Sequence, residues 1–578
     1  MPAPDGRPLK TRVSRYAAVA SLLALVAAAE LSGLQQPSKT PLPPDADPAE
    51  EAFIQTPAGF SKPGKPALAP TSESGTVRLT ILDQATGRPT FARVNVVGAD
   101  GNYYEPDGHA LARWSLSRAG NRPGKGPIRY YGWFFYSSGE AAVRVPAGSV
   151  RIEVWKGYEF RPEQVTTHIA AGASHAVTVT LRRSLPMADH DYYSGDTHIH
   201  LDRRNPDDDE RALDLLAAED IGTGYLLCMN ETNAYAGSMR AQLIPQERGF
   251  GPDSVRSRGP YTIVSGQEYR ASTYGHICLL MHRRLVLEGE TVDPRNWPVF
   301  GLVGRETRQL GGVSFHAHGG YSQEIYADFA QRATDGVELL QFAEYRGIGL
   351  AGWYRMWNIG YRFPAVGACD YPYCRALGDS RTYVHAAARP DPAAWARLAA
   401  EGRSFFTTGP MLLLEVDGQG PGASLRKAGK GPHRVSVRVR ACCEVAPLTH
   451  LEIIVNGRAI RQLAVPRSAG SGQWLVLEEP LSVTESSWIA ARAWSKGPTP
   501  KADAEAHTNP VTVYVDGKAP YRREDVDWLI ERVGDQIAEA EKRTFDEKPR
   551  VLEFFQNSRA ELLRVRESEG QAAPDGSN

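Results

Sequence analysis

The sequence predicts an α/β protein: a central domain of alternating strands and helices, flanked by two β-rich modules and followed by a helical tail. Residues 190–430 alternate short apolar segments with helical segments, whereas the regions on either side alternate apolar and polar residues with the period of a strand. The chain has 578 residues, which suggests about three or four domains. With 42% apolar and 23% charged residues, its composition is that of globular protein.

The N-terminus has the pattern of a secretory signal. Lys10, Arg12 and Arg15 precede an apolar run that ends in the three alanines 27–29. We expect residues 1–31 to be a signal peptide or N-terminal anchor and the protein to be exported, to the periplasm or outside the cell. The run is short of the ~20 residues of a membrane span, and a helix packed on the body is the alternative. Residues 32–74, rich in Pro, Ala and Asp, predict a disordered linker.

Residues 75–185 and 431–518 predict two β-sandwich modules, because short strands are separated by Gly, Pro and Asp turns. The first is similar to the transthyretin-like or carboxypeptidase-regulatory modules of many secreted hydrolases. In the second, NG at 456–457 and DG at 516–517 predict tight turns. Residues 520–568 place apolar residues at helical spacing and predict two amphipathic helices that pack on the body.

The central domain, residues 190–430, contains repeated strand and helix signals. This alternation predicts parallel strands with helices outside, arranged either as a barrel or as an open sheet. The predicted strands are GYLLCM, YTIVSG, HICLLM, GGVSFHA, GVELLQFA and PAVGAC.

Charge and cysteine content exclude some classes of function. The net charge is −1, so no broad basic surface indicates nucleic-acid binding. The six cysteines form no CxxC pair, which disfavours a disulfide framework.

Polar side chains gather where the strands of the central domain begin or end. His198 and His200 point to one side of a strand, because residues i and i+2 share a face. The other candidates at strand junctions are Glu268, His276, His316, His318 and Asp370. Imidazole and carboxylate together suit zinc, manganese or iron. Each motif alone is weak, but their joint occurrence in one domain predicts a metal site.

The motifs GDTHIH, SGQE, GH, FHAH and GACD, in this order, resemble the polymerase-and-histidinol-phosphatase (PHP) domain superfamily. Within it, residues 357–384, 402–418 and 506–517 are most similar to the carbaryl-hydrolase branch, CehA/McbA. The resemblance covers about residues 75–520. It implies a distorted (β/α)7 PHP-type barrel that holds up to three metal ions, flanked here by the β-sandwich modules.

The resemblance also implies roles for individual residues. The first metal of such domains takes the His-x-His pair, a bridging Glu and a late Asp, which match His198, His200, Glu268 and Asp370. The second metal shares the Glu and takes further histidines. They are best matched by His276 and His316, with His318 as another candidate.

Two ligands that are typical of a third metal are missing. Met229-Asn230 stand where the family usually has Asp-His. Asp370-Tyr371-Pro372 lacks the histidine of the usual closing Asp-x-His. We therefore predict one or two divalent ions, Zn²⁺, Mn²⁺ or Fe²⁺, rather than three.

These residues predict a metal-dependent hydrolase that uses metal-bound hydroxide on a carboxylic or carbamate ester of a small molecule. Asp370 is the candidate base, His316 a further catalytic candidate, and Arg381 a candidate for stabilising developing negative charge. The candidates for substrate binding are Asn230, Tyr321 and Arg346. One alternative is a dinuclear phosphoesterase, and another is a non-catalytic glycan- or surface-binding protein with a relic barrel. The oligomeric state stays open.

Overall fold

The structure is a computed structural model that describes residues 70, 73–106, 134–229, 237–238 and 248–571, with short gaps at 289, 294, 343, 372–375, 467–469 and 497–501. The predicted signal or anchor and nearly all of the predicted linker lie outside the described residues, as do Asn230 and Pro372. No helix among the described residues is long and apolar enough to cross a membrane.

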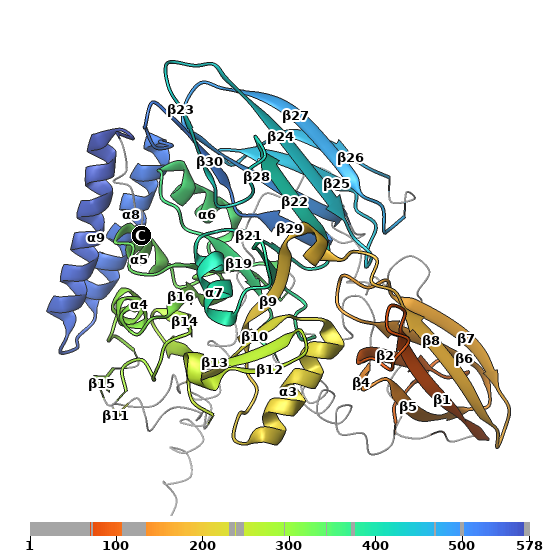
Figure 1. Cartoon of the computed structure of the whole chain (residues 1–578). Helices are drawn as coiled ribbons and strands as arrows, with labels where there is room; N and C mark the ends of the chain where they lie inside the picture. Colours follow the sequence, from red (N-terminus) through yellow and green to blue (C-terminus); the bar gives the residue numbers. More distant parts are fainter. Residues whose placement is uncertain are drawn as a thin grey trace, which may run out of the picture. The chain divides into compact units, whose positions relative to one another are not determined.

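Residues 74–181 form two small sheets from the strands that the alternation predicts (Figure 1). The first contains β1 (Ser74–Asp83), β5 (Glu140–Pro146) and β8 (Ser174–Leu181). The second contains β2 (Ala92–Val97), β3 (Tyr103–Tyr104), β4 (Phe135–Ser137), β6 (Gly148–Trp155) and β7 (Glu163–Ile169). Their buried apolar side chains form one core, as expected when strands expose alternate residues.

In the central region every predicted strand forms. They are β9 (Tyr192–Ile199), β10 (Thr223–Met229), β13 (Tyr261–Ala271), β14 (Gly275–Leu280), β16 (Val313–His316), β17 (Gly336–Gln341) and β19 (Ala365–Ala368). The shorter or flanking strands are β11 (Gly237–Ser238), β12 (Arg256–Arg258), β15 (Thr291–Val292), β18 (Glu344–Tyr345), β20 (Arg381–His385) and β21 (Ser404–Thr407). Together with the helices between them they make a mixed α/β region.

Among the seven predicted strands the pairing departs from the expected parallel order at β14, and the flanking strands β12, β18, β20 and β21 are also antiparallel to their partners. β9, β10 and β13 run parallel, and so do β16, β17 and β19. β14 is antiparallel to both β13 and β16, because three residues, 272–274, join it to β13 and a parallel crossover needs a dozen or more. A bridge between Ile199 and Tyr371 connects the end of β9 with the chain just after β19.

Helices connect these strands and begin where the sequence supplies caps. α3 (Pro206–Glu219) starts with Pro206 and three acidic residues, and the Asn205 side chain accepts a hydrogen bond from the Asp208 N–H. α7 (Pro392–Ala400) also starts with a proline, and the Asp391 side chain accepts a hydrogen bond from the Ala394 N–H. The other helices here are α4 (Phe300–Gln309), α5 (Ile325–Ala330) and α6 (Gly349–Asn358).

The C-terminal region is β-rich and ends in two helices. Its strands are β22 (Met411–Val416), β23 (Ser424–Lys427), β24 (His433–Cys442), β25 (His450–Val455), β26 (Arg458–Ala464), β27 (Leu475–Val483), β28 (Ser487–Lys496), β29 (Ala502–Thr508) and β30 (Val511–Val515). Both predicted turns form, with positive φ at each residue of 456–457 and 516–517. α8 (Arg523–Lys542) and α9 (Lys548–Ser568) pack together, and the Gln331 side chain donates to the Phe554 carbonyl on α9.

Candidate metal centre

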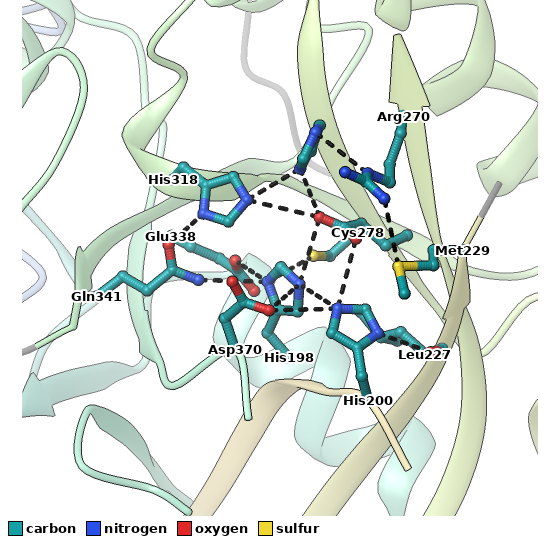
Figure 2. A network of polar contacts seen from close by, with 12 residues as sticks. His198, His200, Leu227, Met229, Arg270, Cys278, His318, Glu338, Gln341 and Asp370 are labelled. Atoms are coloured by element: carbon teal, nitrogen blue, oxygen red, sulfur yellow. Dashed lines mark hydrogen bonds and ion pairs between the residues drawn. The ribbon is translucent and has the colours of Figure 1, made fainter. Parts of the chain in front are cut away.

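His198 and His200 point to one place at the end of β9, as their spacing predicts. The chain stays extended past the strand, since the His200 N–H donates to the Tyr371 carbonyl at 2.7 Å. This contact also brings Asp370 beside the pair. Glu268 reaches the same point from β13, and we call these four side chains the first position; Figure 2 labels three of them, His198, His200 and Asp370.

The distances within the first position fit a tetrahedral ion. The two Nε2 atoms lie 3.1 Å apart, and His198 Nε2 is 3.4 Å from both Glu268 Oε1 and Asp370 Oδ1. His200 Nε2 is 3.4 Å from Glu268 Oε2 and 3.3 Å from Asp370 Oδ1. Four ligands bonded at ~2.1 Å to a tetrahedral ion lie ~3.4 Å from one another. Five of the six separations among the four side chains are therefore close to those of a zinc-type coordination shell, with the two histidines facing different oxygens of Glu268.

The charges at this position favour a cation. Burial alone lowers a histidine pKa, yet Cys278, Glu338 and the other acidic groups raise the pKa of His198 well above its usual value. Hydrogen bonds with Asp370 and Glu268 likewise raise the pKa of His200 to about 9 despite its burial. Acidic groups are thus in excess around two imidazoles, and a divalent ion would neutralise that excess.

Each histidine of the first position is held by an acceptor at its other ring nitrogen. His198 Nδ1 lies 2.8 Å from Glu338 Oε2, whose second oxygen accepts from the Thr197 hydroxyl at 2.6 Å. His200 Nδ1 lies 3.0 Å from the Leu227 carbonyl. Such acceptors fix the tautomer that leaves Nε2 unprotonated and able to bind a metal.

A second group of possible ligands shares Glu268. Glu268 Oε1 is 2.8 Å from His276 Nδ1 and 3.5 Å from His318 Nε2, and these two nitrogens are 2.9 Å apart. We call Glu268, His276 and His318 the second position. Its two histidine side chains are 16% and 13% exposed, whereas His198 is fully buried, so solvent reaches the site from this side.

Sheet register places most of these side chains on one face. Glu268 pairs with Cys278, and Arg270 pairs with His276, across the β13–β14 hairpin. Residues two apart share a face, so all four side chains project toward the centre. Cys278 Sγ accordingly lies 3.2 Å from His198 Nδ1.

Residues at three strand ends have left-handed backbone conformations. His318 (φ 53°), Phe342 (φ 53°) and Asp370 (φ 56°) follow β16, β17 and β19. Such conformations are uncommon for residues other than glycine and often occur where a side chain is aimed at a functional site. Here they turn His318 and Asp370 into the cluster.

The structure does not bring His316 into the cluster. On β16 it pairs with Ile277, which faces away from His276 and Cys278. Its Nε2 lies 3.2 Å from both Asp328 Oδ2 and the Thr334 hydroxyl. The strand ends at His316, so His316 and His318 do not share a face as residues two apart in a strand would. Of these two histidines only His318 points into the cluster.

Arg381 also lies elsewhere. Its guanidinium donates to the Gly378 and Glu219 carbonyls, both at 2.8 Å, and packs over the Tyr158 ring. Since Glu219 is the last residue of α3, this arginine binds the C-terminal end of that helix rather than a reacting group.

Two of the predicted substrate-binding residues border the site. The Tyr321 ring centroid is 6.0 Å from that of His276 and 5.9 Å from that of His318. Tyr321 itself is 40% exposed to solvent. Arg346 lies over the Phe342 ring, which stacks on His318, and donates to Glu344 at 2.9 Å. Asn230 lies outside the described residues.

Sequence reasoning missed several residues of this site. Gln341 Oε1 accepts a hydrogen bond from His318 Nδ1 at 2.6 Å, and Gln341 Nε2 is 3.3 Å from His198 Nδ1. Glu338 is fully buried in β17. An acid inside the apolar segment GVELLQFA was the available signal, because buried carboxylates need partners.

Comparisons with known proteins give little. No protein-family model and no curated protein matches the chain. A third of the chain (33%) matches 52% of the lesion-specific endonuclease PfuEndoQ from Pyrococcus furiosus, at 13% identity and a TM-score of 0.19. A streptococcal ancillary pilin (17% identity, TM-score 0.13) and hydroxyquinol 1,2-dioxygenase from Pseudomonas putida DLL-E4 (10%, 0.13) each match 24% of the chain. The matches span 38% of the pilin chain and 67% of the dioxygenase chain. Because all three TM-scores are low, the function is argued below from the geometry of the site.

Proposed function

We propose that the protein is a metal-dependent hydrolase that cleaves an ester-type bond, a carboxylic or carbamate ester, at the first position. The observation that carries this proposal is the set of five ligand-atom separations between 3.1 and 3.4 Å among His198, His200, Glu268 and Asp370. When bound, a divalent ion supplies a Lewis acid and makes a water molecule nucleophilic near neutral pH.

The proposal assigns roles to this chain's own residues. The four side chains of the first position hold the ion, and Glu338 and the Leu227 carbonyl orient the two imidazoles. His198 and His200 lower the pKa of Asp370, which suits a ligand better than a general base. Tyr321 and Arg346, at the exposed side, are proposed to contact the substrate.

The proposed fold of residues 190–430 is the distorted PHP-type barrel. Its support is that strand pairing runs from β9 to β19 and meets β9 again at the Ile199–Tyr371 bridge. We also propose that the protein is exported, as the N-terminal pattern suggests. If protein recovered outside the cytoplasm lacks residues 1–31, this would support cleavage of a signal peptide.

A phosphoesterase is the second candidate, because the second position shares Glu268 with the first, as in two-metal sites that act on phosphates. One assay panel separates the candidates. The full-length protein, loaded with Zn²⁺ or Mn²⁺, is tested on nitrophenyl acetate, an aryl carbamate and nitrophenyl phosphate. Turnover of the first two supports the ester hydrolase, and turnover of phosphate alone contradicts it. A chain that retains no metal after gentle purification favours the non-catalytic binding protein.

A further inference from the structure

The four histidines of the site differ in what touches their outer ring nitrogen, the one that points away from the other ligand atoms. For each of His198, His200 and His318 a hydrogen-bond acceptor is in contact there: Glu338 (2.8 Å, nearer than the Gln341 amide nitrogen at 3.3 Å), the Leu227 carbonyl and Gln341 Oε1, respectively. For His276 it is the Arg270 guanidinium, whose Nε–H donates to His276 Nε2 at 3.2 Å. Arginine has donors only and keeps its charge in proteins.

This contact determines the tautomer of His276. Because Nε2 accepts from Arg270, the proton of the neutral ring is assigned to Nδ1, where it donates to Glu268 Oε1 at 2.8 Å. A nitrogen that carries a proton has no lone pair for a metal. If Nδ1 bound an ion instead, the proton would move to Nε2 and two donors, on His276 and Arg270, would face each other.

The placement of Arg270 is a property of the fold. Arg270 and His276 are direct partners in the β13–β14 hairpin, so their side chains lie next to each other on one face. The guanidinium is also held beyond His276, where Nη1 donates to Met229 Sδ at 3.4 Å (Figure 2). Moving it away would break both contacts, and leaving it in place keeps a positive charge beside any second ion.

We propose that Arg270 closes the second position, so that the chain holds one tightly bound ion, in the first position, and binds a second ion at His276 and His318 much more weakly. This inference rests on the proposed function, since it assumes that the first position binds metal. Of the one or two ions that the sequence predicts, the inference favours one, and it names Arg270 as the residue that limits the number.

The test is zinc stoichiometry of the full-length protein. The chain is stripped with a chelator and titrated with Zn²⁺, and retained zinc is measured after desalting. We expect wild type to retain one zinc per chain, with any second zinc bound at least ~10-fold more weakly, and Arg270→Gln to retain two. Arg346→Gln, which removes the same charge near His318 without touching a ring nitrogen, should retain the same amount of zinc as wild type, whatever its effect on substrate binding.

Two tight zinc ions in wild type, or one in a folded Arg270→Gln variant, would overturn the proposal, and so would an equal gain in Arg346→Gln. If Arg270→Gln does not fold, His276→Gln decides: its zinc content should equal that of wild type, and a lower content contradicts the proposal. A wild-type chain that binds no zinc rejects the proposed function itself, whereas the other failures leave it standing.

Discussion

Within the part of the chain that the structure describes, the first position and a cluster around His316 both combine buried histidine with carboxylates, and the two differ in geometry. In the first position two imidazoles and two carboxylates converge, with Nε2–Nε2 and Nε2–carboxylate distances of 3.1 to 3.4 Å. In the His316 cluster, His316 lies against Asp328 and Thr334, and Glu324 accepts a hydrogen bond from the Phe300 N–H. There each polar group contacts a different neighbouring segment. Convergence of lone pairs, rather than the number of buried histidines, distinguishes a site from a core.

The most direct test of the difference between the two clusters is to remove one histidine from each. His200→Gln removes a ligand of the first position, and His316→Gln removes a histidine of similar burial outside it. We expect His200→Gln to lose the tightly bound zinc and at least ~100-fold of the hydrolytic activity, because losing a ligand costs more than losing an outer partner. His316→Gln should keep its zinc content.

Zinc content by mass spectrometry and kcat/KM on the active ester measure both effects, with a thermal melt to show that each variant is folded. Equal zinc loss in the two variants would mean that the converging ligand atoms of the first position do not explain where zinc binds.

The next test compares the two carboxylates that hold a histidine. Glu338 is 2.8 Å from His198 Nδ1, and Asp328 is 3.2 Å from His316 Nε2. Glu338→Gln should weaken zinc binding by roughly 10–100-fold, since the acceptor that fixes the tautomer is replaced by an amide. Asp328→Asn should leave zinc affinity unchanged. Competition with a coloured chelator measures both affinities, and an unaffected Glu338→Gln would remove Glu338 from the site.

The turn after His316, residues 317–319, carries His318 and contains Gly319. Gly319 has φ +71°, and a Cβ there would overlap the carbonyl group of Arg346. Gly319→Ala should therefore lower the free energy of unfolding by ~2 kcal/mol or more, from left-handed strain and overpacking.

A glycine in an ordinary helix provides the control for that substitution. Gly534 lies in α8, and a Cβ there meets nothing within 4 Å. Gly534→Ala should be neutral or stabilise by about 0.5–1 kcal/mol. Denaturant unfolding compares the two variants, and a neutral Gly319→Ala would show that the turn tolerates a side chain.

The sequence revealed most strands and part of the site. Strand segments follow from local alternation, and His198 and His200 follow from the period of two. The role that the resemblance implied for His316 is wrong, because β16 ends at this residue and its side chain lies against Asp328 and Thr334. Glu338 was hidden within an apolar strand. Arg270 is placed on His276 by hairpin register, a relation between two strands that no single segment contains.

The smallest expected effect concerns the protonation of the His316 cluster. Burial and the neighbouring Asp328 raise the pKa of Glu324 well above its usual value, against a lowering by Arg543. The folded state therefore holds this proton more tightly than the unfolded chain. The resulting stability is present below the unfolded pKa of ~4.3 and is lost as pH rises through the folded pKa.

Glu324→Gln removes this dependence, because the amide cannot ionise and its oxygen still accepts from the Phe300 N–H. At neutral pH we expect its Tm to exceed that of wild type by about 2 °C, and the difference to vanish toward pH 4. Glu539→Gln, on the exposed side of α8, should show no such trend. Calorimetry at several pH values measures the difference, and a gain that is constant with pH would trace the effect to packing instead of to the carboxyl proton.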